Sequence, residues 1–267
     1  MNKKIVFCGG GNMAEGMIRG ILNNKVVAPA DITVNELRPA RCAYLSETYG
    51  VTAVTDASDA IKEADLAVIA VNPHQVSGVA SMLAPLLKKD AIIASIAAGV
   101  MIETISAAAG ADKKIARIMP NTLSLSGNGY SVVCFTENCS GDDNKVVDEM
   151  LNALGQVMHI DENMFDTFTG FSCTGPLWIY KMIEAMTDAG VYSGFQREDA
   201  RDIVIRNMIG AATVLSMTGE HPAMKVDQMT SPGGTTIEAL KVLQQEGFAN
   251  AIMTSVDACV SKANSLK

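Results

Sequence analysis

The chain has 267 residues, a length that suits one large domain or two modest ones with hydrophobic cores. Apolar residues make up 48% of the chain and charged residues 19%, proportions that are ordinary for a globular protein. The formal net charge is -8 and no block of lysine or arginine stands out. This charge argues against nucleic acid and anionic membrane surfaces as partners.

The N-terminus does not resemble a secretion signal. Lys3 and Lys4 precede only four apolar residues before the first glycines, whereas a signal peptide needs a longer apolar run. The most apolar stretch, residues 91–109, is interrupted by Gly99 and Glu103. It therefore falls short of the roughly 18–20 uncharged residues that span a bilayer. We expect a cytoplasmic protein.

The 6 cysteines and 3 histidines are scattered along the chain. No two cysteines form a C-x-x-C pair, so the spacing favours neither a zinc site nor a disulfide framework. We therefore expect no metal site, and thiols that are free and mostly buried.

The first 160 or so residues alternate between short runs rich in Ile and Val and segments with helical periodicity. Strands are expected within residues 4–9, 31–36, 51–54, 65–71, 90–99, 113–120 and 129–135. Helices are expected within residues 12–24, 39–50, 57–64, 76–88 and 102–110. This alternation predicts an α/β domain with a doubly wound, Rossmann-type parallel sheet covered by helices on both faces.

Beyond about residue 163 the strand patterns stop. Helical periodicity fills residues 164–194, 197–219 and 236–266, with Gly194 and Gly219 as expected helix ends. We therefore predict a nucleotide-binding domain over 1–163 and an all-helical domain over 164–267. Because apolar residues lie on more than one face of these helices, the second domain is expected to associate with itself.

A glycine-rich turn follows the first expected strand and opens the first helix. Gly9, Gly11 and Ala14 fit the G-x-G-x-x-G/A dinucleotide fingerprint, in which the first glycine makes the turn and the second admits the pyrophosphate. The alternative is a tight strand-to-helix turn without a ligand. The candidates that would bind a nicotinamide or flavin nucleotide at the positive end of this helix are Gly9, Gly10, Gly11, Asn12, Met13 and Ala14.

Two charged residues after the second strand leave the choice of nucleotide open. Glu36 is placed to accept hydrogen bonds from the adenosine ribose and to repel a 2′-phosphate, which favours NADH. Arg38 is equally placed to pair with the 2′-phosphate of NADPH. NADPH and NADH therefore both remain candidate cofactors.

The ends of the fourth and fifth strands supply further candidates, because the carboxyl ends of strands border the ligand crevice in doubly wound sheets. Val71, Asn72 and Pro73 follow the fourth strand. Ala97 begins a run of small residues after the fifth strand, which leaves room for a flat ring.

A second glycine-rich turn, "TSPGGTTIEAL", opens a helix near the C-terminus. Ser231 or Thr230 is expected to cap this turn. The backbone N–H groups and hydroxyls there suit a small carboxylate, although a plain helix cap would have a similar pattern. The substrate-binding candidates are Ser231, Gly233, Gly234, Thr235 and Thr236.

Several longer motifs together resemble pyrroline-5-carboxylate reductase. They are "GGGNMAEGMIRG" (9–20), "SIAAGV" (95–100), "RIMPNT" (117–122), "TGEHP" (218–222), "DQMTSPGGTTIEAL" (227–240) and "EGFANAIMTSVDA" (246–258). They span nearly the whole chain in the order found in that family, and "SPGGTTI" is the most specific of them.

The resemblance implies an NAD(P)H-dependent reductase that converts a cyclic imine, 1-pyrroline-5-carboxylate, into L-proline in the last step of proline biosynthesis. It implies a homodimer through the helical domain, which in the family can build rings of dimers. It implies that the turn from Ser231 to Thr235 holds the substrate carboxylate, and that the Thr236 hydroxyl contacts the ring nitrogen as the catalytic group.

The chain also departs from the family pattern. Residues 172–178 read S-C-T-G-P-L-W where the family has S-G-S-G-P-A-Y, and residues 71–73 read V-N-P where it has V-K-P. One alternative is therefore a related reductase of another imine or of a β-hydroxy acid, and a hydroxy-acid substrate would need Lys181 as a general acid. The other alternative is a protein that binds the nucleotide but catalyses no reaction.

Overall fold

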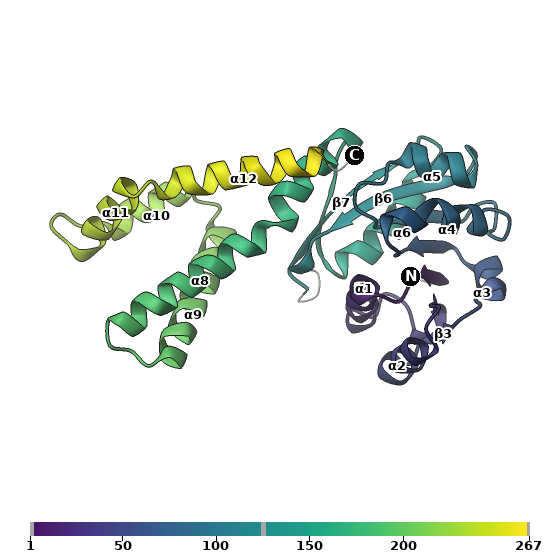
Figure 1. Ribbon diagram of the computed structural model, residues 1–267, viewed down its shortest axis with the longest axis horizontal. Helices are drawn as coiled ribbons and strands as arrows, with labels where there is room; N and C mark the ends of the chain where they lie inside the picture. Colours follow the sequence, from purple (N-terminus) through teal and green to yellow (C-terminus); the bar gives the residue numbers. More distant parts are fainter. Residues whose placement is uncertain (1–2, 124–126, 266–267) are drawn as a thin grey trace. The chain divides into compact units, whose positions relative to one another are not determined.

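The computed structural model describes residues 3–123 and 127–265 (Figure 1). These residues contain an 8-stranded sheet in the order β3-β2-β1-β4-β5-β6-β7-β8. The order reverses direction between β1 and β4, as in doubly wound sheets. The strands are β1 (Ile5–Cys8), β2 (Ile32–Asn35), β3 (Thr52–Val54), β4 (Leu66–Ile69), β5 (Ile92–Ser95), β6 (Lys114–Pro120), β7 (Gly129–Phe135) and β8 (Gly155–His159).

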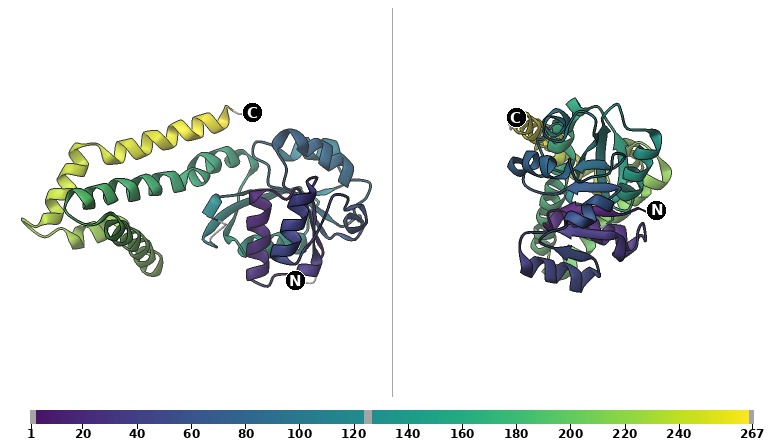
Figure 2. Two further views of the ribbon diagram at one scale, coloured as in Figure 1. Left: turned by 60° about the horizontal axis from the view of Figure 1, so that its bottom comes forward. Right: turned by 90° about the vertical axis from the view of Figure 1, so that its right-hand side faces the viewer.

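Helices cover both faces of this sheet, as the sequence predicts. Met17, Leu45 and Leu151 join one apolar core cluster, so their helices α1, α2 and α6 share a face. Ile61, Leu83 and Ile105 lie in the other cluster with α3, α4 and α5. Figure 2 shows α1 and α2 side by side. The helices are α1 (Asn12–Asn23), α2 (Pro39–Tyr49), α3 (Ser58–Glu63), α4 (Val76–Leu83), α5 (Ile102–Ala109) and α6 (Gly141–Asn152).

The central strands are apolar along their whole length because both of their faces are covered. All four residues of β1 and of β4 are buried, and the two strands pair in parallel with Ile5 opposite Leu66. A strand with one solvated face would alternate polar and apolar residues instead. These continuous runs made β1, β4 and β5 recognisable in the sequence.

The far end of the sheet differs from the all-parallel expectation. Strand β7 runs antiparallel to β6, with Ile118 opposite Val133. The connection between them, residues 121–128, is too short for the crossover that a parallel pair requires. The sequence analysis also missed α6 and the edge strand β8, whose pattern G-Q-V-M-H lacks a buried apolar run.

The chain divides into two compact units. Residues 1–173 and 262–267 form the first unit and residues 174–261 the second. The sequence analysis placed the division after residue 163. The sheet unit continues further because Phe165 and Phe168, in α7 (Phe165–Phe168), pack against Met119 and Val132 of its sheet.

The second unit is helical, as predicted. It contains α8 (Gly175–Tyr192), α9 (Arg197–Thr218), α10 (Pro222–Met229), α11 (Thr235–Gln245) and all but the last three residues of α12 (Phe248–Asn264). Helix α9 ends at Gly219, which adopts the left-handed conformation (φ 65°) that favours glycine. None of the helices in the described part of the chain carries an apolar stretch long enough to cross a bilayer.

The helical unit exposes much apolar surface. In α9, Ile209 is 57% exposed and Met217 is 80% exposed. No side chain in α10, α11 or the described part of α12 is buried. Apolar exposure on this scale is typical of an interface with another chain.

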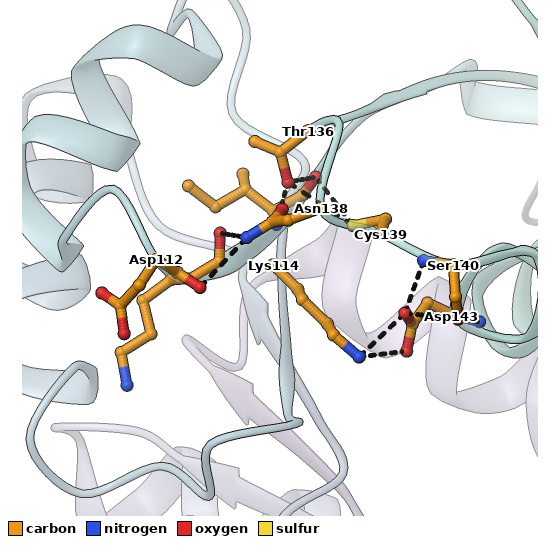
Figure 3. A network of polar contacts seen from close by, with 9 residues as sticks. Asp112, Lys114, Thr136, Asn138, Cys139, Ser140 and Asp143 are labelled. Atoms are coloured by element: carbon orange, nitrogen blue, oxygen red, sulfur yellow. Dashed lines mark hydrogen bonds and ion pairs between the residues drawn. The ribbon is translucent and has the colours of Figure 1, made fainter.

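A polar network ties the start of α6 to β6 (Figure 3). Lys114 Nζ lies 2.9 Å from Asp143 Oδ2, and that carboxylate also accepts from the Ser140 N–H at 2.7 Å. Burial opposes ionisation of Asp143, but these hydrogen bonds outweigh it and hold the pKa of Asp143 below its usual 3.8. The ionised carboxylate therefore stabilises the folded state.

We predict that Asp143→Asn lowers the free energy of unfolding by about 1 kcal/mol at neutral pH, because it weakens a partly buried ion pair and a helix cap. The difference should shrink as the pH falls from 3.8 through the lower pKa of the folded state, because the unfolded carboxylate binds a proton first and the folded one only at lower pH. Urea unfolding at several pH values measures it. Lys145→Met, which breaks an exposed pair with Asp142 on the same helix, is the control and should change little.

Candidate active site

A cleft of about 930 Å³ lies at the carboxyl ends of the parallel strands. Its lining includes Cys8 at the end of β1, Asn35 at the end of β2 and Ala70 just after β4. This is the place where strand order reverses and where open α/β sheets bind their ligands.

The structure brings together in this cleft every residue that the sequence proposed for the nucleotide. Their role in nucleotide binding stays a prediction. These residues are Gly9, Gly10, Gly11, Asn12, Met13, Ala14, Glu36, Arg38, Val71, Asn72, Pro73 and Ala97.

The three glycines of the first turn differ in what a Cβ atom at each position would contact. Gly9 has a φ of 104°, and a Cβ there would lie 2.4 Å from the Ala70 carbonyl oxygen. A Cβ on Gly10 would lie 2.8 Å from Leu45 Cδ1. A Cβ on Gly11 would meet no atom within 4 Å. Gly9 is therefore required by the chain's own packing, and a side chain at Gly10 would require Leu45 to move. Gly11 leaves space for a ligand to approach the backbone.

The start of α1 suits a phosphate group. Gly11 is its N-cap and no side chain caps it, so the first backbone N–H groups have no partner within the helix. Such groups, with the positive end of the helix dipole, form an anion site at the rim of the cleft. The residues present therefore fit the pyrophosphate of a dinucleotide.

Glu36 and Arg38 form one ion pair, although in the sequence Glu36 favours NADH and Arg38 favours NADPH. Glu36 Oε1 accepts from the Arg38 N–H at 3.0 Å and from Arg38 Nε at 2.9 Å, while Oε2 accepts from the Gly10 N–H at 3.0 Å. The hydrogen bond from Arg38 is the main reason that the pKa of Glu36 lies below its usual value. The side chain of Arg38 is 68% exposed, whereas that of Glu36 is 9% exposed.

The turn after β4 explains Asn72, which replaces a lysine in the family pattern. Asn72 is the N-cap of a 3-10 turn, Pro73–Gln75, and forms a reciprocal capping box with Gln75. Proline is favoured at the first position of such a turn. The sequence pattern N-P-x-Q indicates such a capped turn and could have predicted it.

The cleft also has lining residues that the sequence analysis did not propose. Most of them lie at or just after the carboxyl ends of β1, β2, β4, β5 and β6, where the general rule on strand ends could have found them. Four others belong to α4 or to the 3-10 turn before it, namely Gln75, Gly78, Val79 and Met82. Thr169 and Cys173 come from a π-helical segment, Thr169–Cys173, that follows α7, and only the fold brings them to the cleft. The additional residues are Cys8, Asn35, Leu37, Ala70, Gln75, Gly78, Val79, Met82, Ile96, Ala98, Met119, Pro120, Thr122, Thr169 and Cys173.

Cys173 stands where the resembling family has glycine, so it adds a side chain to the cleft lining. Burial raises the pKa of its thiol to about 11, which leaves it protonated and a poor nucleophile at neutral pH. The thiol therefore narrows this end of the cleft and supplies no reactive group there.

The second glycine-rich turn lies in the helical unit and has an open helix start. Its cap differs from the expectation: Gly234 is the N-cap of α11 and no side chain caps the helix. Thr230 instead donates to the Val226 carbonyl at the end of α10, and Ser231 accepts the Gly234 N–H through its backbone carbonyl. A Cβ on Gly234 would lie 2.5 Å from Ser231 Oγ, so a larger residue there would require the Ser231 side chain to move.

The remaining substrate candidates surround this helix start. Gly233 adopts a φ of 70°, which reverses the chain just before α11. Thr235 and Thr236 are the first two residues of α11, and both are exposed. The turn therefore presents unsatisfied N–H groups and two hydroxyls, the arrangement that binds a carboxylate.

Two other residues of the helical unit have structural partners. Lys181, the candidate acid for a hydroxy-acid substrate, pairs with Glu184 one turn along α8. Trp178 is half-buried and donates from Nε1 to Ser255 Oγ at 2.5 Å. Among the described residues, no three His, Cys, Asp or Glu side chains gather where they could hold a metal ion.

The sheet with its glycine-lined cleft, followed by a helical unit, defines the class of two-unit NAD(P)H-dependent oxidoreductases. Residues 4–99 match a family model described as NADP oxidoreductase, coenzyme F420-dependent. Residues 162–266 match one described as pyrroline-5-carboxylate reductase dimerisation.

Individual relatives narrow this class. A pyrroline-5-carboxylate reductase of Glycine max is 35% identical over 97% of this chain and 94% of its own. A solved reductase of that name from Coxiella burnetii is 29% identical, with a TM-score of 0.93 over 100% of this chain and 99% of its own. One from Plasmodium falciparum, solved with NADP bound, is 26% identical, with a TM-score of 0.87 over 99% and 98%. The chain belongs to the pyrroline-5-carboxylate reductase family.

We predict that Gly11→Ala leaves the protein folded but raises the Kd for NAD(P)H at least tenfold, because its Cβ meets only open space within the chain yet would occupy the approach of the pyrophosphate. Nucleotide fluorescence titration and thermal unfolding measure the two effects. Gly9→Ala is the contrasting variant and should lower stability as well, since its Cβ strikes the Ala70 carbonyl. Unchanged binding by Gly11→Ala would contradict the assignment.

Proposed function

We propose that this protein is an NAD(P)H-dependent pyrroline-5-carboxylate reductase that makes L-proline by hydride transfer to the cyclic imine. The observation that carries the proposal is the pair of open helix starts, one beside the glycine-lined cleft and one in the turn with the sequence S-P-G-G-T-T. Each is suited to hold one anion, the nucleotide pyrophosphate in the first and the substrate carboxylate in the second.

The chemistry needs few special side chains. A protonated carbon–nitrogen double bond is already electrophilic, so the protein's main task is to place it. The bound nicotinamide supplies the hydride. Ser231, Gly233, Gly234 and Thr235 hold the substrate carboxylate through backbone N–H groups and hydroxyls, and the Thr236 hydroxyl orients the ring nitrogen and relays its proton.

Self-association belongs to the same proposal. The family model that covers the helical unit is a dimerisation model, and helices α9–α12 expose apolar side chains that a second copy would cover. We propose a homodimer through residues 174–261, with larger rings of dimers as a further step. The free state of all six cysteines is typical of a reducing compartment, so we place the protein in the cytoplasm.

We predict that adding 1-pyrroline-5-carboxylate to the protein and NAD(P)H causes nucleotide oxidation, and that Thr236→Ala lowers kcat about tenfold or more because the ring nitrogen loses its hydroxyl partner. Absorbance of the reduced nucleotide measures both rates. Thr236→Ser retains the hydroxyl and should keep most of the activity, and the KM for the nucleotide should not change. Faster turnover of a six-membered cyclic imine would overturn the substrate while leaving the reaction class intact.

We further propose that Glu36 makes NADH the preferred nucleotide. Its carboxylate is held by two backbone N–H groups, those of Gly10 and Arg38, so it stays at the end of β2. The positive charge of Arg38 is already paired with it and is largely in solvent. A 2′-phosphate would therefore face a fixed negative charge.

We predict that the KM for NADH lies about tenfold below that for NADPH, and that Glu36→Gln narrows this ratio by removing the charge while keeping the shape. Steady-state titration of both nucleotides at fixed imine measures it. Arg38→Met is the matched variant and should keep the preference for NADH. A preference for NADPH that disappears in Arg38→Met would instead assign the discrimination to Arg38.

A further inference from the structure

The peptide backbone at Gly10 is held by side chains on both of its polar groups. Its N–H donates to Glu36 Oε2 at 3.0 Å, and its carbonyl accepts from Arg41 Nε at 2.7 Å. Glu36 follows β2 and Arg41 lies in the first turn of α2, so both come from the next β–α unit along the chain. The glycine turn thus depends on a neighbouring element for its orientation.

Arg41 also bridges this turn to the helix that follows it. Arg41 Nε donates to the Gly10 carbonyl just before α1. Nη2 of the same guanidinium donates to Glu15 Oε2 in α1 at 2.5 Å. The side chains of Arg41 and Glu15 are each 19% exposed, so solvent screens this pair less than a surface pair. One planar guanidinium therefore links the backbone just before the first N–H groups of α1 to a side chain of the helix just after them.

Two tyrosines of α2 complete the cluster. Tyr49 donates to Glu15 Oε1 at 2.7 Å and Tyr44 donates to the same oxygen at 3.0 Å. Burial raises the pKa of Glu15, but the hydrogen bonds from Tyr49, Arg41 and Tyr44 outweigh it and hold that pKa below its usual value. Burial and the Glu15 carboxylate raise the pKa of Tyr49 to about 12, which keeps its donor proton in place.

The charge of Glu15 makes this arrangement matter for an anion site. A carboxylate in the first turn of α1 stands close to the N–H groups proposed to bind the pyrophosphate, and like charges repel. Arg41 and the two tyrosine hydroxyls offset that charge and turn it toward α2. Neither Arg41 nor Glu15 lines the cleft, so neither is placed to touch the nucleotide directly.

We infer that Arg41, with Glu15, Tyr44 and Tyr49, is a positioning cluster that holds the glycine turn and the start of α1 in the conformation that binds NAD(P)H. The inference rests on the proposed function for its ligand, a dinucleotide pyrophosphate. A turn that is built before the ligand arrives loses less conformational freedom on binding, so the cluster contributes to nucleotide affinity from outside the cleft.

The test is to compare nucleotide binding and catalysis of the full chain in three variants. Arg41→Met removes both hydrogen bonds but keeps an unbranched side chain, and Arg41→Lys keeps the charge and one donor. Lys62→Met breaks the exposed Lys62–Asp59 pair in the same unit and is the control. Kd values for NADH and NADPH come from fluorescence titration without imine, and KM and kcat come from steady-state rates.

We expect Arg41→Met to raise the Kd and KM for the nucleotide about tenfold, with the KM for the imine and kcat at saturating nucleotide within about twofold of wild type. Arg41→Lys should recover part of the loss, and Lys62→Met should bind as wild type does. If Arg41→Met does not fold, Tyr49→Phe tests the same inference, and we expect it to raise the Kd for the nucleotide about threefold. Wild-type affinity in Tyr49→Phe would then overturn the inference.

Two results would overturn the inference when Arg41→Met does fold. One is a nucleotide Kd equal to that of wild type. The other is a loss that affects kcat and both KM values alike without rescue by lysine, which would show a merely structural role. The proposed function fails separately, because a wild-type protein that binds neither NADH nor NADPH would refute it before any variant is compared.

Discussion

The close approach of β1 and β4 is the constraint on which the nucleotide site depends. These two strands pair in register, and the turn after β1 passes so near the Ala70 carbonyl that a Cβ on Gly9 would lie 2.4 Å from it. The chain must therefore leave the sheet through a residue without a side chain and in a backbone conformation with φ of 104°. The same turn exposes the start of α1 at the point where strand order reverses, which is why the cleft lies there.

An acidic protein that binds an anionic nucleotide has to do so without a strong positive field. With a net charge of -8, this chain offers open backbone N–H groups at two helix starts rather than clusters of basic side chains. Its charged residues near the glycine turn are paired internally, Glu36 with Arg38 and Glu15 with Arg41. Such pairing limits long-range repulsion, so the local dipoles of the backbone determine what the cleft attracts.

The helical unit exposes an unusually large amount of apolar surface. Helices α8 and α9 bury only a few side chains in the single chain, and Met217 and Tyr192 are almost fully exposed. Burying such surface against a second copy would stabilise both chains, since apolar area removed from water is favourable at roughly 25 cal/mol per Å². The same unit carries both the exposed apolar helices and the turn with Thr236, which we propose as the catalytic group.

How far the sequence predicts the site follows from how local each feature is. The glycine turn, the strand ends at residues 71–73 and the turn at 231–236 are patterns within a few residues, and all were recognised without coordinates. Thr169, Cys173 and Met82 were not, because they reach the cleft only through the packing of α7 and α4. The cap of α11 was misassigned, since Thr230 satisfies a carbonyl of the preceding helix and not the start of the next.

The sequence by itself determined the alternation of strands and helices, the change to an all-helical unit and the two glycine-rich helix starts, because periodicity and turn chemistry are short-range properties. Only the tertiary structure decided that Glu36 and Arg38 form one ion pair, that Arg41 binds the Gly10 carbonyl, and that Thr169 and Cys173 reach the cleft. These contacts join residues from different elements or depend on side-chain direction, and no local pattern specifies which of several possible partners lies within hydrogen-bonding distance.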